Sequence, residues 1–403
     1  MPEGPEVQTI ADGLRALITG KTFSAVAFFG DAVRMVDQSD ATALEAMIAG
    51  QPVIDVGRRG KFIDIALGNG LHLLIHLMMT GRVVFTDATH PLEPPRFLRC
   101  SFTFTDGAAL HLGDQRKWAR LLCLTDEQLA TEQAATGGRS RLLDLGVDAL
   151  GDEFTYPRFR ALLTSRRNLH TFLLDQKKLS GLGNIYVNEA LFHAGLHPLR
   201  AANSLSETEA MALYYAIRHV LREAVRQLGT SFSHYWRPDG TPGAFQNFLH
   251  VFRRAGEPCL RCGTPIVRNG LGGRGAFFCP NGQSYGGDPP PPGSEFGPGA
   301  PLPNHILILA GSDTPANRAR AAQIAAHVPY TQSLPQADAA LIEYTLRAGR
   351  DALLLLPDEE AAALQARYRN VHRIAPEGET NEAMLHAAFD AIYAIRCQNP
   401  IAS

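Results

Sequence analysis

The segment LDQKKLSGLGNIYVNEALFHAGLHP, residues 174–198, divides into two helical pieces at Gly181-Leu182-Gly183. A glycine-rich turn that opens a helix presents free backbone N–H groups to an anion. A DNA phosphate fits such a turn, and the side-chain amide of Asn184 supplies a further donor. An ordinary core of two packed helices has the same pattern, so the turn alone does not choose between the two interpretations.

The region that contains this segment and the region before it differ in the spacing of their apolar residues. Residues 151–245 are mainly helical, with a capping box at Ser206 to Glu209 before a long apolar helix that stops at Gly229. Residues 1–150 begin with a helix over about 4–19 and then alternate apolar and polar residues, which predicts a β-sandwich. The strands expected there include 23–29, 61–67, 72–77, 81–86 and 99–106.

The extreme N-terminus reads MPEGPEV. Removal of Met1 leaves a secondary amine on Pro2, which titrates near pH ~8 and is a nucleophile in its neutral form. Such an amine can attack a sugar C1′ and form an iminium, and Glu3 and Glu6 lie close enough in sequence to exchange protons with it. In the alternative interpretation, Pro2 only precedes a helix whose first turn favours acidic residues.

Residues 246–283 contain three of the six cysteines. Cys259 and Cys262 form a Cys-x2-Cys pair and Cys279 follows, which is the spacing of a zinc hairpin. The expected fourth ligand is replaced by Gly282. Three thiolates leave one coordination position for water or an outside ligand, so we expect one zinc ion with lowered affinity.

A Pro/Gly-rich linker over 284–303 precedes a different kind of domain. Residues 304–403 alternate short apolar strands and helices, which predicts a small α/β domain with a parallel sheet. The expected strands are 305–311, 352–357 and 371–375, and the expected helices begin near 315, 358 and 381. GSDTPAN after the first strand leaves a nucleotide or a protein as the expected partner of this domain.

Composition restricts the class of protein further. The 403 residues include 45% hydrophobic ones, 38 Lys and Arg, and 40 Asp and Glu, which excludes a disordered or fibrous chain. No run approaches the roughly 20 apolar residues of a membrane helix, and the N-terminus does not resemble a signal peptide. Six cysteines are too few for a disulfide scaffold. We therefore expect a cytoplasmic protein with no membrane partner.

The net charge of −2 conceals an uneven distribution along the chain. Residues 281–403 hold 8 Lys and Arg against 13 Asp and Glu, so the first 280 residues are mildly basic. A basic region is compatible with binding phosphates but does not demonstrate it.

All of these motifs occur together in one order, and the first 283 residues resemble a formamidopyrimidine-DNA glycosylase. The signatures are MPEGPEV, RRGKF (58–62), HLMMTGR (76–82), DQRKW (114–118), the segment at 174–192 and the cysteine region from 242 to 280. The resemblance implies an N-terminal β-sandwich (1–150), a helix-two-turns-helix domain (151–245) and a zinc hairpin (246–283), with DNA in the cleft between them. It also implies a bacterial protein associated with the nucleoid.

The resemblance also assigns roles to individual residues. It implies that Pro2 is the Schiff-base nucleophile and that Glu3 is the acid that opens the sugar ring. Lys61 would contact phosphates near the lesion and assist elimination, although an exposed strand lysine is the plain alternative. Asn184 and Arg274 would hold phosphates on either side of the extruded nucleotide.

An extruded base leaves a gap in the DNA stack, and the family fills it with side chains. The matching positions are Met79, Arg116 and Trp118, where Trp118 replaces the usual Phe. Core packing is the alternative for Met79 and Trp118, because both follow apolar strands. Glu6 completes the residues that we expect to face DNA.

The resemblance therefore predicts a monomeric, bifunctional DNA glycosylase and AP lyase acting on oxidised purines in double-stranded DNA. Two alternatives remain open. Gly4 in MPEGPEV is commoner in the related endonuclease VIII branch, which removes oxidised pyrimidines, and the loop from Ser231 to Gly240 would decide between the branches. A damage-binding protein without catalysis is the other alternative, which retention of Pro2, Glu3 and Lys61 disfavours.

Overall fold

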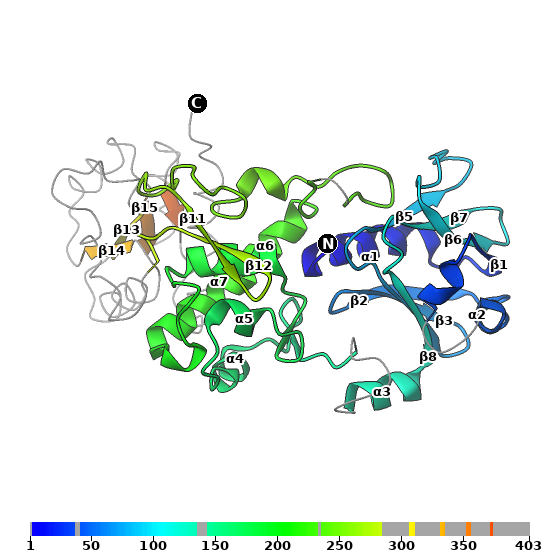
Figure 1. Cartoon of the computed structure of the whole chain (residues 1–403), viewed down its shortest axis with the longest axis horizontal. Coiled ribbons are helices and arrows are strands. Elements are labelled where there is room, and N and C mark those ends of the chain that lie inside the picture. Colours follow the sequence, from blue (N-terminus) through cyan, green and yellow to red (C-terminus); the bar gives the residue numbers. More distant parts are fainter. Residues whose placement is uncertain are drawn as a thin grey trace. The chain divides into compact units, whose positions relative to one another are not determined.

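The computed structural model describes residues 2–36, 41–134, 143–232 and 235–283, together with four short strands beyond residue 305. The predicted linker at 284–303 lies outside the described residues. The chain groups into two compact units (Figure 1). The first comprises Met1–Phe154, Leu173–Gly183 and Leu221–Leu249, and the second comprises Thr155–Phe172, Asn184–Val220 and His250–Ser403. Leu173–Gly183 and most of Leu221–Leu249 come from the region predicted to be helical (151–245), but they belong to the same unit as the predicted sandwich.

The first unit contains the predicted β-sandwich. Two antiparallel four-stranded sheets have the strand orders β1-β6-β7-β5 and β2-β3-β4-β8. The five strands expected from alternation are present, and β2, β7 and β8 complete the sheets. The strands are β1 (Phe23–Phe28), β2 (Val53–Arg59), β3 (Phe62–Leu67), β4 (Leu71–His76), β5 (Gly81–Thr86), β6 (Leu98–Phe104), β7 (Ala109–Asp114) and β8 (Arg120–Thr125).

Helix α1 (Gly4–Ile18) packs its apolar stripe into the sandwich core, as its period predicted. Val7, Ile10, Leu14 and Ile18 are at most 1% exposed. Each such buried side chain contributes about 1.5–3 kcal/mol, and truncation of Leu14 to Ala would cost about 2–5 kcal/mol. The core therefore fixes α1, and with it the N-terminus.

Short elements complete the first unit. Helices α2 (Ala41–Ile48) and α3 (Asp126–Ala134) and the 3-10 turns η1 (Ala32–Met35) and η3 (Phe245–Phe248) lie in its sequence segments. Strand β9 (Val147–Asp148) pairs in parallel with β10 (Leu179–Ser180). This pair holds the chain just before the glycine turn in place.

The second unit contains α4 (Tyr156–Leu162), α5 (Leu169–Leu173) except its last residue, α6 (Asn184–His193), the turn η2 (Ala202–Ser204) and α7 (Glu207–Arg226) as far as Val220. The last residues of α7 belong to the first unit. The predicted capping box is present, because Ser206 Oγ accepts the Glu209 N–H at 3.3 Å and the Glu209 carboxylate accepts the Ser206 N–H at 2.9 Å. Beyond the end of α7, Gly229 has φ +82° and its N–H donates to Ala224 O at 2.7 Å. Glycine is suited to this left-handed stop.

The predicted hairpin consists of β11 (Val267–Leu271) and β12 (Arg274–Phe278), which pair antiparallel. A fully buried carboxylate on α6, that of Glu189, holds the chain that precedes the hairpin. It accepts the N–H groups of His250, Val251 and Phe252 at 2.8–3.0 Å. Burial alone would raise the pKa of Glu189, but the His250 side chain and these N–H groups lower it overall.

Four strands lie beyond residue 305. Strands β13 (Ile306–Ala310), β14 (Thr331–Leu334), β15 (Ala352–Leu355) and β16 (Val371–Arg373) pair in parallel in the order β14-β13-β15-β16. Three of them match the expected strands. The helices expected near 315, 358 and 381 lie outside the described residues, so the α/β assignment stays a prediction. Among the helices that are described, none is long and apolar enough to span a membrane.

Candidate active site

Two buried carboxylates fix the N-terminus of the first unit. Glu3 is 3% exposed and Glu6 is 1% exposed. Glu6 accepts the Glu3 N–H at 2.8 Å with one oxygen and the Thr230 N–H at 2.7 Å with the other. Glu6 therefore positions the chain end next to Pro2, while its predicted contact with DNA stays a prediction.

The glycine turn packs against this chain end. The Gly4 N–H donates to Gly181 O at 2.8 Å, and Gly181 has φ +89°. A Cβ on Gly183 would lie 2.2 Å from Glu3 Cδ, so no larger residue fits there. The glycine turn, whose N–H groups are candidates for phosphate binding, thus also shapes the surroundings of Glu3.

Lys61 lies in the turn between β2 and β3 and is only 7% exposed, which excludes the alternative of an exposed strand lysine. Arg58 secures this turn through two hydrogen bonds to Asp148, at 2.6 and 2.9 Å. Burial, together with the charges of Lys61 and Arg120, lowers the pKa of His76 to about 3. The imidazole beside Lys61 is therefore neutral at pH 7.

The three predicted gap-filling residues lie on two turns of the first unit. Met79 is 37% exposed and Trp118 is 46% exposed. The guanidinium of Arg116 lies over the Trp118 ring, 5.0 Å from its centroid. Their exposure excludes the core-packing alternative and leaves Met79 and Trp118 available for stacking.

Asp114 connects these two turns, although the sequence had suggested no role for it. Its carboxylate is 1% exposed and accepts the Thr80 hydroxyl and the backbone N–H groups of Arg116, Trp118 and Ala119, at 2.6–3.1 Å for the three N–H donors. Aspartate commonly organises a turn by accepting the N–H groups that follow it. The sequence signal that could have identified Asp114 is its position as the first residue of the motif DQRKW.

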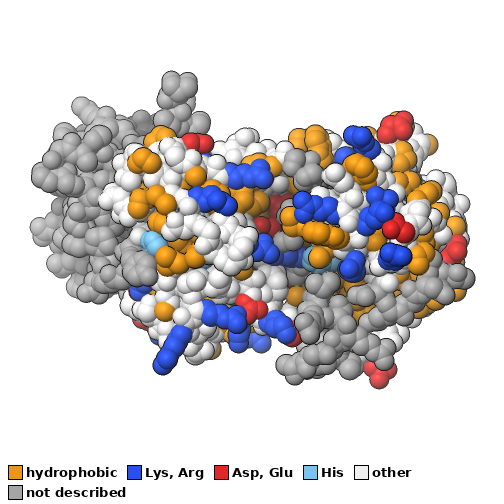
Figure 2. Space-filling view, in the orientation of Figure 1, with side chains coloured by type: hydrophobic (Ala, Val, Ile, Leu, Met, Phe, Trp, Pro, Cys, Tyr) orange, Lys and Arg blue, Asp and Glu red, His pale blue; other side chains and the backbone are white. Residues whose placement is uncertain are grey.

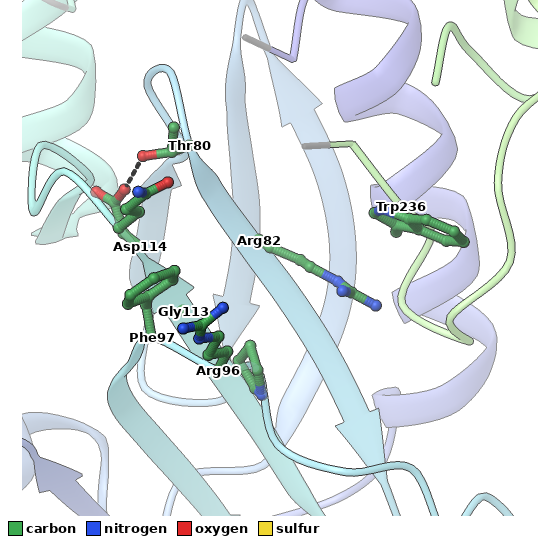
Figure 3. A pocket seen from close by; sticks show the side chains of 9 residues that line it. Thr80, Arg82, Arg96, Phe97, Gly113, Asp114 and Trp236 are labelled. Atoms are coloured by element: carbon green, nitrogen blue, oxygen red, sulfur yellow. Dashed lines mark hydrogen bonds between the residues drawn. The ribbon is translucent and has the colours of Figure 1, made fainter. Parts of the chain in front are cut away.

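A small pocket of about 200 Å³ lies beside the Thr80–Asp114 bond (Figure 3). Arg82 extends from β5 toward Trp236, with its guanidinium 5.5 Å from the ring centroid. Burial lowers the pKa of Arg82. The pocket is below the roughly 300–1,000 Å³ typical of small-molecule sites, so it could hold only a small group.

The second unit brings the two predicted phosphate contacts together. Asn184 at the start of α6 donates to Gly275 O at 2.9 Å, next to Arg274 at the start of β12. Its other side-chain atom, Oδ1, lies 3.0 Å from Nε2 of His170. Burial chiefly, with a smaller effect of the Arg274 charge, lowers the pKa of His170 to about 4 despite the bond to Asn184. Asn184 therefore contacts a buried imidazole that is neutral at pH 7, and the charge of Arg274 acts on the same imidazole.

Basic side chains lie on the surface of both units. Figure 2 shows Lys and Arg side chains over the face viewed on each unit, with few acidic ones among them. Positive surface of this kind attracts a phosphate backbone.

The three cysteines of the hairpin region meet as predicted. Their sulfur atoms lie within 4.8 Å of one another, and Cys262 and Cys279 are 3.5 Å apart. Backbone N–H groups point at two sulfurs, from Arg261 to Cys259 at 3.4 Å and from Gly282 to Cys279 at 3.3 Å. Such N–H···S bonds favour thiolates, so the cluster fits three of the four ligands of a structural zinc ion.

Three family descriptions match successive parts of the chain. Residues 1–121 match "Formamidopyrimidine-DNA glycosylase N-terminal domain", and residues 145–235 match "Formamidopyrimidine-DNA glycosylase H2TH domain". Residues 256–281 match "Zinc finger found in FPG and IleRS". The order of the three matched domains agrees with the observed fold and with the cluster of three cysteines. Together they define an enzyme of the DNA glycosylase class.

Sequence identity to known proteins identifies the family within this class. The chain is 39% identical over 291 residues to formamidopyrimidine-DNA glycosylase of Thermus thermophilus, covering 71% of this chain and 100% of the relative. It is 38% identical over 284 residues to that of Shouchella clausii, covering 70% and 99%. The crystal structure of MutM (Fpg) from Thermus thermophilus is similar, with TM-score 0.61 and 38% identity over 71% of this chain and all of that chain. The chain belongs to the formamidopyrimidine-DNA glycosylase family.

Relatives have also been solved on DNA. A complex between Lactococcus lactis Fpg and DNA containing an abasic site has TM-score 0.62 and 29% identity, covering 70% of this chain and 99% of that one. MutM in complex with DNA containing carbocyclic 8-oxo-G has TM-score 0.62 and 30% identity, covering 70% and 100%. Residues 304–403 lie outside the family domains.

Proposed function

We propose that this chain excises oxidised purines, 8-oxoguanine and formamidopyrimidines, from double-stranded DNA and then cleaves the abasic strand as a lyase. The observation that carries the proposal is the fixed N-terminus. Glu3 is buried beside Pro2, Glu6 holds the Glu3 backbone, and Gly183 leaves room for the Glu3 side chain. A preorganised acid next to a nucleophilic amine suits attack on a sugar carbon.

The reaction follows from these groups. After removal of Met1, the Pro2 amine attacks C1′, and the damaged base leaves with the electrons of the C1′–N bond and takes up a proton. The bound amine then loses its own proton, and its lone pair breaks the C1′–O4′ bond as Glu3 protonates the ring oxygen O4′, which opens the sugar as an iminium. The resulting iminium acidifies the C2′ proton. Loss of that proton expels the 3′ phosphate by β-elimination, and a second elimination expels the 5′ phosphate.

The other predicted residues hold DNA in register for this attack. Lys61 neutralises phosphate charge near the lesion and assists elimination. Asn184 and Arg274 hold phosphates on either side of the extruded nucleotide. Met79, Arg116 and Trp118 fill the gap in the base stack.

Zinc has a structural role in this proposal. Cys259, Cys262 and Cys279 would hold one ion, which would cross-link the segment before the hairpin to the end of β12. Elemental analysis of protein purified without chelator tests this. A content under about one tenth of an equivalent would exclude a resident zinc ion.

Relatives support purine lesions as substrates. Besides the 8-oxo-G complex, a mutant of Lactococcus lactis FPG has been solved with DNA containing Fapy-dG, at 30% identity to this chain. The loop from Ser231 to Gly240, expected to choose between purine and pyrimidine, includes residues 233–234, which lie outside the described part of the chain.

Borohydride trapping tests the proposal. The full chain is incubated with duplexes containing 8-oxoguanine, an oxidised pyrimidine or an abasic site, beside a Pro2→Gly variant. We expect a covalent adduct on 8-oxoguanine that weakens sharply in the variant. An adduct only on the pyrimidine would transfer the chain to the endonuclease VIII-like activity, and no adduct on any duplex would indicate a damage-binding protein.

A further inference from the structure

The cysteine cluster has three protein ligands in the described part of the chain. Cys259, Cys262 and Cys279 come together there, and no other His, Cys, Asp or Glu among the described residues joins them. Structural zinc sites are almost always four-coordinate. A fourth donor must therefore come from elsewhere.

The residues nearest the expected fourth position are committed to other bonds. The Gly282 N–H donates to Cys279 Sγ at 3.3 Å, and glycine has no side chain to offer. Gln283 is 2% exposed, accepts the Cys279 N–H at 2.8 Å and donates to Leu196 O at 2.9 Å. Its carboxamide links the end of the hairpin region to the chain after α6 and is not available as a ligand.

Other donors in the described part of the chain are poorly suited. The Thr264 hydroxyl lies 3.3 Å from Cys262 Sγ, but a neutral hydroxyl is a weak zinc ligand beside thiolates. Cys100 is fully buried in the core of the first unit, and Cys123 packs against the same core. Cys262 and Gly282 are both partly exposed, so the incomplete side of the cluster is accessible to solvent.

The hairpin is anchored without the metal. The Phe277 N–H donates to Asn188 Oδ1 at 2.6 Å. Arg261 donates to Phe192 O at 3.0 Å, with its guanidinium 3.9 Å from the centre of the Phe192 ring. With the Glu189 bonds, these contacts hold both ends of the hairpin region to α6. A ligand can therefore exchange at the metal without unfolding the hairpin.

We propose that the cluster is a three-thiolate metal site whose fourth coordination position takes a small exogenous thiolate. Sulfur donors suit a metal already bound by thiolates, and a small thiol can enter from the solvent side. Its binding forms one metal–sulfur bond and releases the thiol proton to buffer, with no change of oxidation state. The proposal does not depend on the glycosylase chemistry.

Cobalt(II) spectroscopy of the full chain tests this site. The cobalt-loaded protein is titrated with 2-mercaptoethanol under anaerobic conditions, beside a Gly282→Cys variant. In the parent, we expect a saturable increase of about one third in sulfur-to-cobalt charge-transfer intensity, because three cobalt–sulfur bonds become four. In Gly282→Cys, we expect no response to thiol and zinc affinity on the order of tenfold higher or more.

Several outcomes would overturn the proposal. These are failure of the parent to bind cobalt, a parent spectrum that ignores added thiol, and a thiol response in Gly282→Cys as large as the parent's. Thr264→Val and Cys397→Ser check for a donor from the chain itself, since Cys397 lies outside the described residues. If the parent ignores thiol and either variant responds, the fourth ligand belongs to the protein. Borohydride trapping on the same preparations reports separately on the proposed glycosylase activity.

Discussion

A buried histidine lies beside a predicted phosphate-binding cation in each of the two units. In the first unit, burial and the charges of Lys61 and Arg120 lower the pKa of His76 to about 3. In the second, burial and Arg274 lower the pKa of His170 to about 4, while the bond to Asn184 opposes the shift. Both imidazoles are neutral at pH 7, so neither adds charge beside the cation.

The two units differ in how they hold the surrounding residues. Buried carboxylates organise the first unit, where Glu6 holds the N-terminus and Asp114 holds the turns that carry the predicted gap-filling residues. In the second, the carboxamides of Asn184 and Asn188 hold the strand that carries Arg274, while the Glu189 carboxylate holds the chain before the hairpin. Charged acceptors form stronger bonds than neutral ones, which suits residues that must meet a reacting sugar in one geometry. We therefore expect substitutions in the first unit to change rate and substitutions in the second to change affinity.

Glu3→Gln has the largest expected effect. Loss of a positioned general acid should slow 8-oxoguanine excision by about 10²- to 10⁴-fold. Single-turnover assays measure the rate, and affinity for a duplex with an uncleavable abasic-site analogue should stay close to that of the parent. A rate within about threefold of the parent would contradict the assigned role.

Asp114→Asn should come next. An amide cannot accept all the N–H and O–H donors that converge on Asp114, so we expect unfolding free energy to fall by about 2–4 kcal/mol. Excision from duplex DNA should slow more than lyase cleavage of an abasic site in single-stranded DNA, where no gap in a duplex is filled. Thr80→Val, which removes one of the donors, serves as the milder control. Equal slowing of both reactions would argue against a gap-filling role.

His170→Gln tests the comparison through pH. The folded pKa of about 4 lies below the ordinary 6.5, so His170 contributes stability that is fully present above pH 6.5 and is lost as pH falls toward 4. The variant should lose less stability than the parent across that window, by about 3 kcal/mol at most. Urea unfolding at several pH values measures the difference. The control is His90→Gln, because His90 is partly exposed. If the parent and His170→Gln lose the same unfolding free energy as pH falls from 6.5 toward 4, His170 does not titrate as described.

Arg274→Ala should have the smallest effect on the reaction itself. Loss of one phosphate contact should reduce the slope of log affinity against log salt by about 1, without changing the excision rate at saturating enzyme. Binding titrations at several salt concentrations measure the slope, with exposed Arg166→Ala as the matched control. A fall in the saturated rate instead would place Arg274 in the chemistry and remove the proposed division between the units.

Local patterns predicted the elements that carry the site. The helical spacing of apolar residues predicted α1, and the capping box together with the glycine after the helix predicted α7. Both signals lie within a short stretch of sequence, so they can be recognised without knowledge of the tertiary structure. The motifs also supplied the residues proposed for the chemistry, from Pro2 to the three cysteines, and their roles stay predictions. The tail is the exception, since β14 was not expected and the predicted helices lie outside the described residues.

The amino-acid sequence by itself determined the family, the candidate nucleophile and acid, and the incomplete zinc ligand set, because each depends on residues close together in the chain. Only the tertiary structure decided what holds them. Glu6 meets Thr230 across 224 residues, and Arg58 meets Asp148 across 90. The same holds for the burial of Lys61 and the low pKa of His170. Such partners are set by packing of distant segments, and no local period or motif records which backbone N–H group a buried carboxylate will meet.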